Sequence, residues 1–322
     1  MAAGAYPMSY LATAGASAAP ITRLGWGLLT ISIVVVLMVG ALLAGALWRR
    51  RAGVSPDPEG RLPVERRGPG LRWVWVGVGI STLALFVSTV WTLTTLAAVR
   101  HPPRPPALTI QVTGHDWWWE ARYLGDAPGR DFTTANELHI PVGQPVRLEL
   151  RSADVIHSFW IPKLGGKTDL IPGRTNMAWI EADRPGDYRG QCGEFCGLEH
   201  ARMALQVVAD PPAAFQAWRD RQLAAPAPAA SPPIAAGAAV FQARCGACHA
   251  IRGTPAGGLF GPDLSHLALR RTLAAGTLTN DPQGLTAWLA DPQAIKPGNE
   301  MPRVPLTDGD RAALVAYLQS LS

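Results

Sequence analysis

Four side chains that could bind a metal ion lie close together in the sequence. The stretch QCGEFCGLEHARM, residues 191–203, holds two of the four cysteines of the chain with one histidine and one methionine, namely Cys192, Cys196, His200 and Met203. A helix would place all four on one face, but Gly193 and Gly197 disfavour a helix, so we expect a glycine-rich loop. Thiolate, imidazole and thioether groups together form the soft ligand set that selects copper, whereas a structural disulfide, the alternative, needs neither the histidine nor the methionine. The residue types therefore favour a copper site.

The other two cysteines belong to a C-x-x-C-H motif. In RCGACH, Cys245 and Cys248 could form thioethers with haem vinyl groups, and the neighbouring His249 could ligate the iron. C-x-x-C also occurs in thiol redox and zinc sites, but no second cysteine or histidine pair with zinc spacing lies in this part of the sequence. Met301 in KPGNEMP is the expected second axial ligand, whereas the competing His266 is expected to face solvent. The motif therefore predicts a covalently bound haem c.

Two long apolar segments precede the residues that could do this chemistry. The 322-residue chain is 48% hydrophobic and 16% charged, and the runs from Gly25 to Trp48 and from Trp73 to Val99 contain no charged residue. Each exceeds the roughly 20 residues that cross a bilayer. We therefore expect a transmembrane hairpin over residues 23–100. The alanine-rich segment before it, residues 1–22, lacks the basic region of a cleavable signal peptide.

The distribution of charge predicts the orientation of this hairpin. The connecting loop, Arg49 to Arg72, holds seven arginines, whereas only Arg23 precedes the first apolar run. Basic residues favour the cytoplasmic side, so the loop is predicted to be cytoplasmic and both termini to lie outside. The net charge of +5 comes partly from this loop and therefore does not indicate nucleic-acid binding.

Two exported domains are predicted after the hairpin. Residues 107–210 alternate apolar and polar side chains and contain turn sequences such as PVGQP and RPGDY, which favours a β-sandwich. Met177, in the strand-like TNMAWI, is expected in its core. Residues 211–235 are predicted to form a short helix and a proline- and alanine-rich linker. The helical pattern of residues 236–322 predicts a small all-α domain.

With these residues in place, the chain resembles subunit II of the haem-copper cytochrome c oxidases, in the form that carries a C-terminal cytochrome c domain. The segments that carry the resemblance are GHDWWWEARY, SADVIHSFWIPKLGGKTDLIPGR, GDYRGQCGEFCGLEHARM, CGACH, GPDL and KPGNEMP. The resemblance implies a multidomain membrane protein with two transmembrane α-helices, a cupredoxin-like Greek-key β-sandwich that holds a binuclear copper A centre, and a C-terminal all-α cytochrome c domain.

The resemblance also implies roles for individual residues. The implied ligands of the two coppers are the bridging thiolates of Cys192 and Cys196, the imidazoles of His157 and His200, the weak ligand Met203 and the backbone carbonyl of Glu194. In this family the Glu194 carboxylate also faces a magnesium ion at the border with subunit I. Trp117 stands at the electron-input position, where it is expected at the surface. The family usually has a glutamine at the neighbouring position, which is Asp116 in this sequence. The Pro262 carbonyl is expected to orient His249.

The implied function is electron input to a respiratory, proton-translocating cytochrome c oxidase, from haem c to copper A and on to the oxygen-reducing centre of subunit I. The two apolar runs contain no histidine or charged residue, so the intramembrane haems must belong to subunit I. Further implied partners are subunit III, membrane lipid, and a soluble or membrane-bound cytochrome or a cytochrome reductase complex as electron donor. The implied location is the bacterial inner membrane, with the copper and haem domains on the periplasmic side.

Two other functions remain open at this point. The copper A subunit of a membrane nitric oxide reductase could carry the same domains, and only the histidine pattern of its partner subunit would distinguish it. A membrane-tethered copper-binding module would have no use for a covalent haem. Nitrous oxide reductase needs a large histidine-rich catalytic domain, and subunit II of a quinol oxidase lacks the copper ligands, so both are disfavoured.

Overall fold

The computed structural model describes residues 8–48, 70–227 and 231–322. The chain divides into two compact units, of which one is residues 20–100 and the other combines the N-terminal residues up to Ala19 with residues 101–322. Most of the predicted arginine-rich loop, residues 49–69, lies outside the described residues, and so do residues 1–7 and three residues of the predicted linker.

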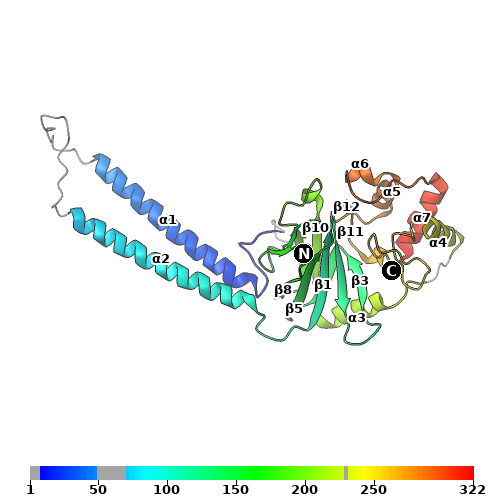
Figure 1. The fold of residues 1–322 in the computed structure, drawn as a ribbon, viewed down its shortest axis with the longest axis horizontal. Helices are drawn as coiled ribbons and strands as arrows, with labels where there is room; N and C mark the ends of the chain where they lie inside the picture. Colours follow the sequence, from blue (N-terminus) through cyan, green and yellow to red (C-terminus); the bar gives the residue numbers. More distant parts are fainter. Residues whose placement is uncertain (1–7, 49–69, 228–230) are drawn as a thin grey trace. The chain divides into compact units, whose positions relative to one another are not determined.

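The smaller unit is a pair of long helices, α1 (Ala18–Trp48) and α2 (Gly70–Arg100) (Figure 1). Both are long and apolar enough to cross a membrane, with mean hydropathies of 2.7 and 1.8 in their most apolar stretches. Gly27 of α1 lies against the ring of Trp91, so close that an added methyl group would overlap it. Small residues at such contacts let membrane helices approach each other. The predicted spans lie within α1 and α2, and α1 begins inside the predicted N-terminal segment.

Residues 107–210 form the predicted β-sandwich. The larger sheet has the order β3-β2-β1-β5-β8 and consists of β1 (Leu108–His115), β2 (Trp118–Leu124), β3 (Phe132–Ala135), β5 (Val146–Ser152) and β8 (Asn176–Ile180). The smaller sheet has the order β4-β10-β9 and consists of β4 (Glu137–Pro141), β9 (Gly186–Gln191) and β10 (Ala204–Asp210). A third pair joins β6 (His157–Phe159) to β7 (Thr168–Leu170). The pairs β1–β5 and β4–β10 are parallel, because the chain crosses between the sheets.

The core of the sandwich follows from the alternation along its strands. In β1, Ile110 and Val112 point inward and are fully buried, as Leu148 and Leu150 are in the neighbouring β5. Met177 departs from the prediction, because its side chain is 54% exposed. Met177 of the edge strand β8 pairs with the polar Glu149 of β5 on the outer face of the sheet. Its location in a strand therefore did not determine which face its side chain occupies.

Two further segments pack on the sandwich. The predicted short helix is α3 (Pro212–Leu223), whose Trp218 stacks on His139 with ring centroids 4.2 Å apart. At the other end of the chain, Ala14 is 2% exposed, and its N–H donates to the carbonyl of Lys163 over 2.8 Å. The carbonyl of Ala14 accepts the N–H of Asp183 at the same distance. The segment that precedes α1 is therefore attached to the sandwich.

The C-terminal domain contains α4 (Pro232–Arg244), α5 (Pro282–Ala290), α6 (Pro292–Ile295) and α7 (Asp308–Ser320). Phe241 of α4 and Tyr317 of α7 form the centre of their contact, with ring centroids 5.8 Å apart. The domain departs from the all-α prediction in one short hairpin, β11 (Thr272–Leu273) with β12 (Leu278–Thr279). The predicted linker also ends early, since Pro232 begins α4, and proline favours the first turn of a helix.

Candidate metal and haem sites

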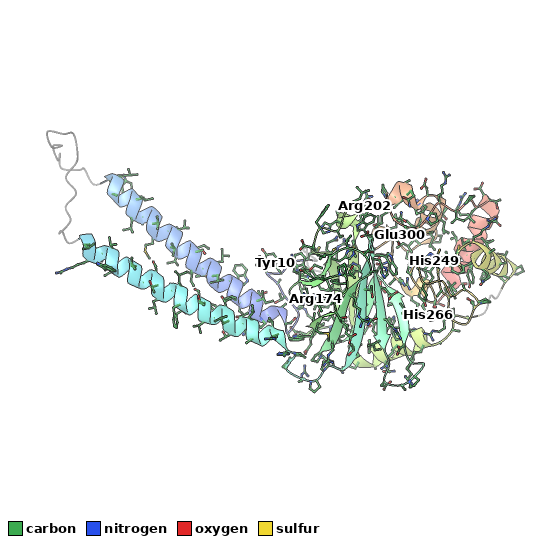
Figure 2. All side chains as sticks on the ribbon, in the orientation of Figure 1. Tyr10, Arg174, Arg202, His249, His266 and Glu300 are labelled. Atoms are coloured by element: carbon green, nitrogen blue, oxygen red, sulfur yellow. The ribbon has the colours of Figure 1, made fainter. Side chains whose placement is uncertain are left out.

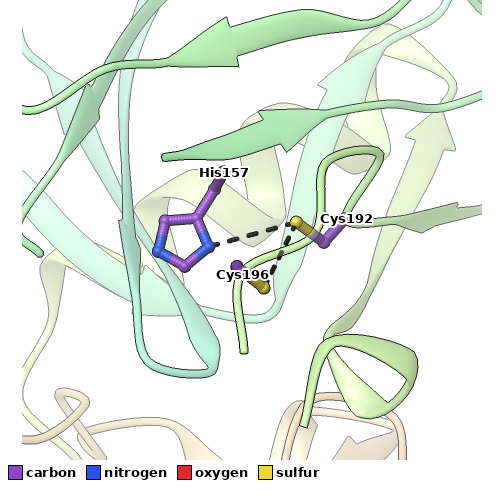
Figure 3. A group of neighbouring side chains, drawn as sticks. All are labelled: His157, Cys192 and Cys196. Carbon is purple, nitrogen blue, oxygen red and sulfur yellow. Dashed lines mark hydrogen bonds between the residues drawn. The ribbon is translucent and has the colours of Figure 1, made fainter. Parts of the chain in front are cut away.

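The four side chains of residues 191–203 converge with His157 at one end of the sandwich. Cys192 follows β9, Cys196 lies in a loop, and His200 begins a short 3-10 helix that ends before Met203. Cys196 is central, because its Sγ lies 3.8 Å from Cys192 Sγ, 3.6 Å from His200 Nδ1 and 3.8 Å from Met203 Sδ. His157 Nδ1 lies 4.0 Å from Cys192 Sγ (Figure 3). The glycine-rich loop predicted from the sequence is confirmed, and both thiols are free.

The two thiols cannot easily ionise together. A hydrogen bond from Cys196 lowers the pKa of the Cys192 thiol to about 3, although burial acts in the opposite direction. The resulting thiolate, with burial, raises the pKa of Cys196 far above its usual range. The pair therefore holds one proton between two sulfur atoms that are nearly excluded from water. Metal cations in place of that proton would allow both sulfurs to be thiolates, so the donor set fits the copper centre that the sequence predicts.

His157 is fully buried and held in one orientation. Its Nε2 lies 2.7 Å from the Asp154 carboxylate, which leaves Nδ1 directed at Cys192. Burial alone would lower the pKa of His157, but Asp154 and Cys192 outweigh it and raise this pKa to about 9. Gly114 of β1 makes room for the ring, since an added Cβ would lie 2.7 Å from its Cδ2. A carboxylate behind a ligating histidine is the usual arrangement at metal sites.

Glu194 offers two different oxygen donors. Its backbone carbonyl lies 3.2 Å from Cys192 Sγ and so faces the cluster, as the resemblance implies. Its carboxylate points elsewhere and forms an ion pair with Lys167, whose Nζ is 3.3 Å away. Both side chains are about half exposed. The carboxylate would have to exchange this lysine for a metal ion if a partner subunit supplied the remaining ligands.

Trp117 connects the cluster to the C-terminal domain. Its indole Nε1 donates a hydrogen bond of 2.7 Å to the carbonyl of Cys196. The residue is only 9% exposed, so the sequence-based expectation of a surface side chain is wrong. Residues of the C-terminal domain cover it: Gly298 faces its ring, and Lys296 binds its carbonyl. Its neighbours differ, since Trp119 is fully buried in the core and Trp118 stacks on His115.

A cavity of about 700 Å³ in the C-terminal domain reaches the ring of Trp117. Cys245, Cys248, His249 and Met301 line it together with apolar side chains. His249 Nδ1 donates to the carbonyl of Pro262 over 2.8 Å, as predicted. Burial lowers the pKa of His249, so the ring stays neutral at pH 7 and Nε2 keeps its lone pair for a metal. Figure 2 labels His249 within this domain.

The cavity is also lined by a partly buried cation that the sequence did not reveal. Arg270 lines it, its Nε has no hydrogen-bond partner among the described residues, and burial lowers its pKa. The carboxylates of Asp263 and Glu137 act on this pKa in the opposite direction, and the N–H at Nε can still bind a further anion. Haem carries two propionates, so this arginine and the thiol pair both fit the predicted haem. No local motif marks Arg270, since its burial depends on the fold.

His266 is not the solvent-facing residue that the sequence suggested. It is 4% exposed, and its Nε2 lies 3.1 Å from the carbonyl of Ala224, at the end of α3. His266 is also not among the described residues that line the cavity, whereas Met301 is. The structure therefore favours Met301 over His266 as the residue that can reach a group bound to His249.

Comparison with known proteins identifies the domains that carry the two sites. Residues 120–210 match the family profile described as "Cytochrome C oxidase subunit II, periplasmic domain", and residues 234–322 match "Cytochrome c". The chain is 37% identical over 297 residues to cytochrome c oxidase subunit 2 of Alkalihalophilus pseudofirmus, covering 90% of this chain and 83% of that protein. The chain belongs to the cytochrome c oxidase subunit II family. This subunit II is also 32% identical over 292 residues to that of Bacillus sp. strain PS3, covering 85% and 80% of the two chains.

A solved structure is similar over part of this chain. The periplasmic domain of subunit II (CoxB) of Bradyrhizobium japonicum is 32% identical, with a TM-score of 0.35, covering 37% of this chain and 95% of that one. Membership of the family implies a copper A centre on a cupredoxin fold, and the cytochrome c domain implies a haem. This subunit II is thus part of a haem-copper oxidase, an oxidoreductase whose subunit I is its partner.

Proposed function

We propose that this subunit receives electrons at a covalent haem c in its C-terminal domain and delivers them, past Trp117, to a binuclear copper A centre and then to subunit I. One observation carries the proposal: Trp117 both lines the haem cavity and donates its indole N–H to the peptide of Cys196. When bound, haem and the copper pair would each supply a one-electron carrier. The family name favours this role over the nitric oxide reductase and copper-module alternatives.

The residues of the sandwich would hold two coppers in a rigid, dry setting. Cys192, Cys196, His157 and His200 would hold the two ions, and Met203 and the Glu194 carbonyl would complete the set. Asp154 fixes the His157 ring, and the sandwich fixes the loop ends. Ligands held in this way change little when an electron arrives, which favours rapid transfer. The sandwich is hereafter the copper domain, residues 107–210.

The residues of the C-terminal domain, hereafter the haem domain (231–322), would attach and orient the haem. Cys245 and Cys248 would form the thioethers, and Pro262 would keep the His249 ring oriented toward the iron. Met301 would supply a thioether to the iron, and a thioether ligand raises the potential of a haem relative to a second histidine. Arg270 would balance a propionate. The Glu194 carboxylate already pairs with Lys167. A magnesium ion at this carboxylate would therefore need further ligands from subunit I.

The membrane orientation is proposed from two independent features. The arginine-rich loop favours the cytoplasm. Ala14 is hydrogen-bonded to Lys163 and Asp183 of the copper domain, so the N-terminal segment and the copper domain would lie on one side of the membrane. We infer a bacterial inner-membrane protein with both domains in the periplasm. Subunit III and a cytochrome or cytochrome reductase complex complete the proposed partners.

Purified protein should contain two coppers and one covalent haem per chain. All four cysteines carry free thiols in the structure, one pair at each site, which leaves none for a disulfide. Metal analysis and a pyridine haemochrome assay measure both quantities. One copper per chain, or haem that acidic acetone extracts, would contradict the proposed cofactor set.

A further inference from the structure

The haem domain meets the copper domain through the loop of residues 295–301, hereafter the junction loop, and Lys296 is its most enclosed side chain. Lys296 is 2% exposed. Its Nζ donates to the carbonyls of Trp117 over 2.6 Å, Arg202 over 3.0 Å and Ala274 over 3.4 Å. An ammonium has three N–H groups and no acceptor. Two of its three partners belong to the copper domain and one to the haem domain, so a single group joins both.

The groups that Lys296 joins lie next to proposed ligands in both domains. The indole of Trp117 is bonded to the Cys196 carbonyl, and Arg202 directly precedes Met203. On the other side, Lys296 lies on the same loop as Met301. Gln293 of α6, just before the loop, donates from Nε2 to the carbonyl of Met301 over 2.9 Å. The ammonium is thus placed between the peptide that presents the coppers' ligands and the loop that presents the haem's second ligand.

The rest of the junction loop is shaped to the same surface. Arg202 donates from its guanidinium to the carbonyl of Ile295 over 2.7 Å. In this bond the copper domain supplies the donor, whereas in the Lys296 bonds the junction loop supplies it. Gly298 has φ +80°, and an added Cβ would lie 3.5 Å from Leu198 and 3.6 Å from the ring of Trp117. The loop therefore lies on Trp117 with its backbone close to the indole, and a small shift of the loop would separate the two.

Other contacts hold the domains together away from this junction. The backbone N–H of Arg271 donates to the Glu137 carboxylate over 3.0 Å, and Arg252 donates to the carbonyl of Asp131 over 3.1 Å.

Burial lowers the pKa of Lys296 to about 8, with the Glu199 carboxylate acting in the opposite direction. Burying this ammonium therefore costs free energy at neutral pH. A buried charge of this kind is better suited to fixing one register between surfaces than to strengthening their association.

We propose that Lys296 is a positioning residue that fixes the register of the haem domain on Trp117, and so sets the rate of haem-to-copper electron transfer. The inference rests on the proposed function above. Because Arg271 and Arg252 retain their contacts, loss of the lysine should leave the domains associated but the junction loop displaced.

The test replaces Lys296 with methionine, which keeps an unbranched chain and removes all three donors. The rate of haem-to-copper transfer after a rapid reduction pulse should fall about tenfold, as for a misplacement of under ~1 Å in an oriented reaction. The haem and copper spectra and both reduction potentials should stay unchanged. Hydrogen–deuterium exchange of residues 115–119 and 200–206 should rise, which is a readout that needs no electron transfer.

Three comparisons separate the possible outcomes. Lys163→Met makes the same chemical change at a lysine of the copper domain that does not contact Trp117, and it should alter neither rate nor exchange. Lys296→Arg should restore part of the rate. If wild-type protein shows no haem-to-copper transfer, the proposed function fails. If wild type transfers and Lys296→Met matches it in rate and exchange, only the lysine inference fails. Should Lys296→Met lose haem, Lys296→Gln repeats the test, and haem loss in both would overturn positioning in favour of a folding role.

Discussion

Replacing Cys196 with serine should remove copper from the protein while the haem stays attached. Cys196 Sγ is the central atom of the cluster, within 3.8 Å of Cys192, His200 and Met203. A serine oxygen is a hard donor with a much higher pKa than a thiol, so it cannot bridge two soft ions. Loss of an orienting partner alone costs 10–100-fold in metal affinity, and we expect loss of this ligand to cost at least about 100-fold.

The matched control is the same substitution in the other cysteine pair. Cys245→Ser should leave the copper content and the copper spectrum unchanged while it removes one thioether from the haem. Metal analysis and absorption spectra of both variants measure the two effects separately. Retention of two coppers in Cys196→Ser would contradict the assignment of the bridging thiolates.

Replacing Trp117 with alanine should slow haem-to-copper transfer by about 100-fold. This is the loss of rate that a misplacement of about 1 Å causes in other reactions between oriented groups. The ring spans the gap between the haem cavity and the Cys196 peptide, so its removal leaves a void where the two sites meet. Transient absorption after a reduction pulse measures this rate. Trp117→Phe keeps a ring but loses the indole N–H, and its rate should lie between those of wild type and alanine.

Two controls separate conduction from structure in this experiment. Trp118 also lines the cavity but stacks on His115 instead of bonding to Cys196, so Trp118→Ala should leave the rate unchanged. A large buried aromatic side chain contributes about 3–5 kcal/mol to stability, so the copper spectrum must be recorded for each variant. A wild-type rate in Trp117→Ala would remove this residue from the route, and an altered copper spectrum would show that its role is structural.

Features with a local cause could be predicted from the sequence. Two charge-free runs suffice to predict α1 and α2. Cys192 through Met203 are neighbours in the chain, so their residue types and glycines indicated both the ligands and the loop. The C-x-x-C-H motif likewise contains both thiols and the histidine. At both cysteine motifs the residues that indicate the chemistry lie within a dozen positions of one another.

Features that depend on contacts between distant segments could not be predicted. Lys296 reaches Trp117 across 179 positions of sequence, and nothing near either residue indicates the other. Trp117 was expected at the surface because the haem domain that covers it follows a linker whose path the sequence does not specify. His266 is buried by tertiary packing, and Arg270 lines the cavity through tertiary packing, which residue type alone does not predict. Met177 is a similar case, because the sequence predicted its strand but not the face of the sheet on which its side chain lies.

The most direct test of the account is to reduce the haem of the purified full-length protein with a short pulse and follow both centres with time. We predict that haem reoxidation and copper reduction proceed with one shared rate, and that this rate does not change with protein concentration, because both centres belong to one chain. A rate that rises in proportion to protein concentration, or a haem that stays reduced while the copper is oxidised, would contradict it.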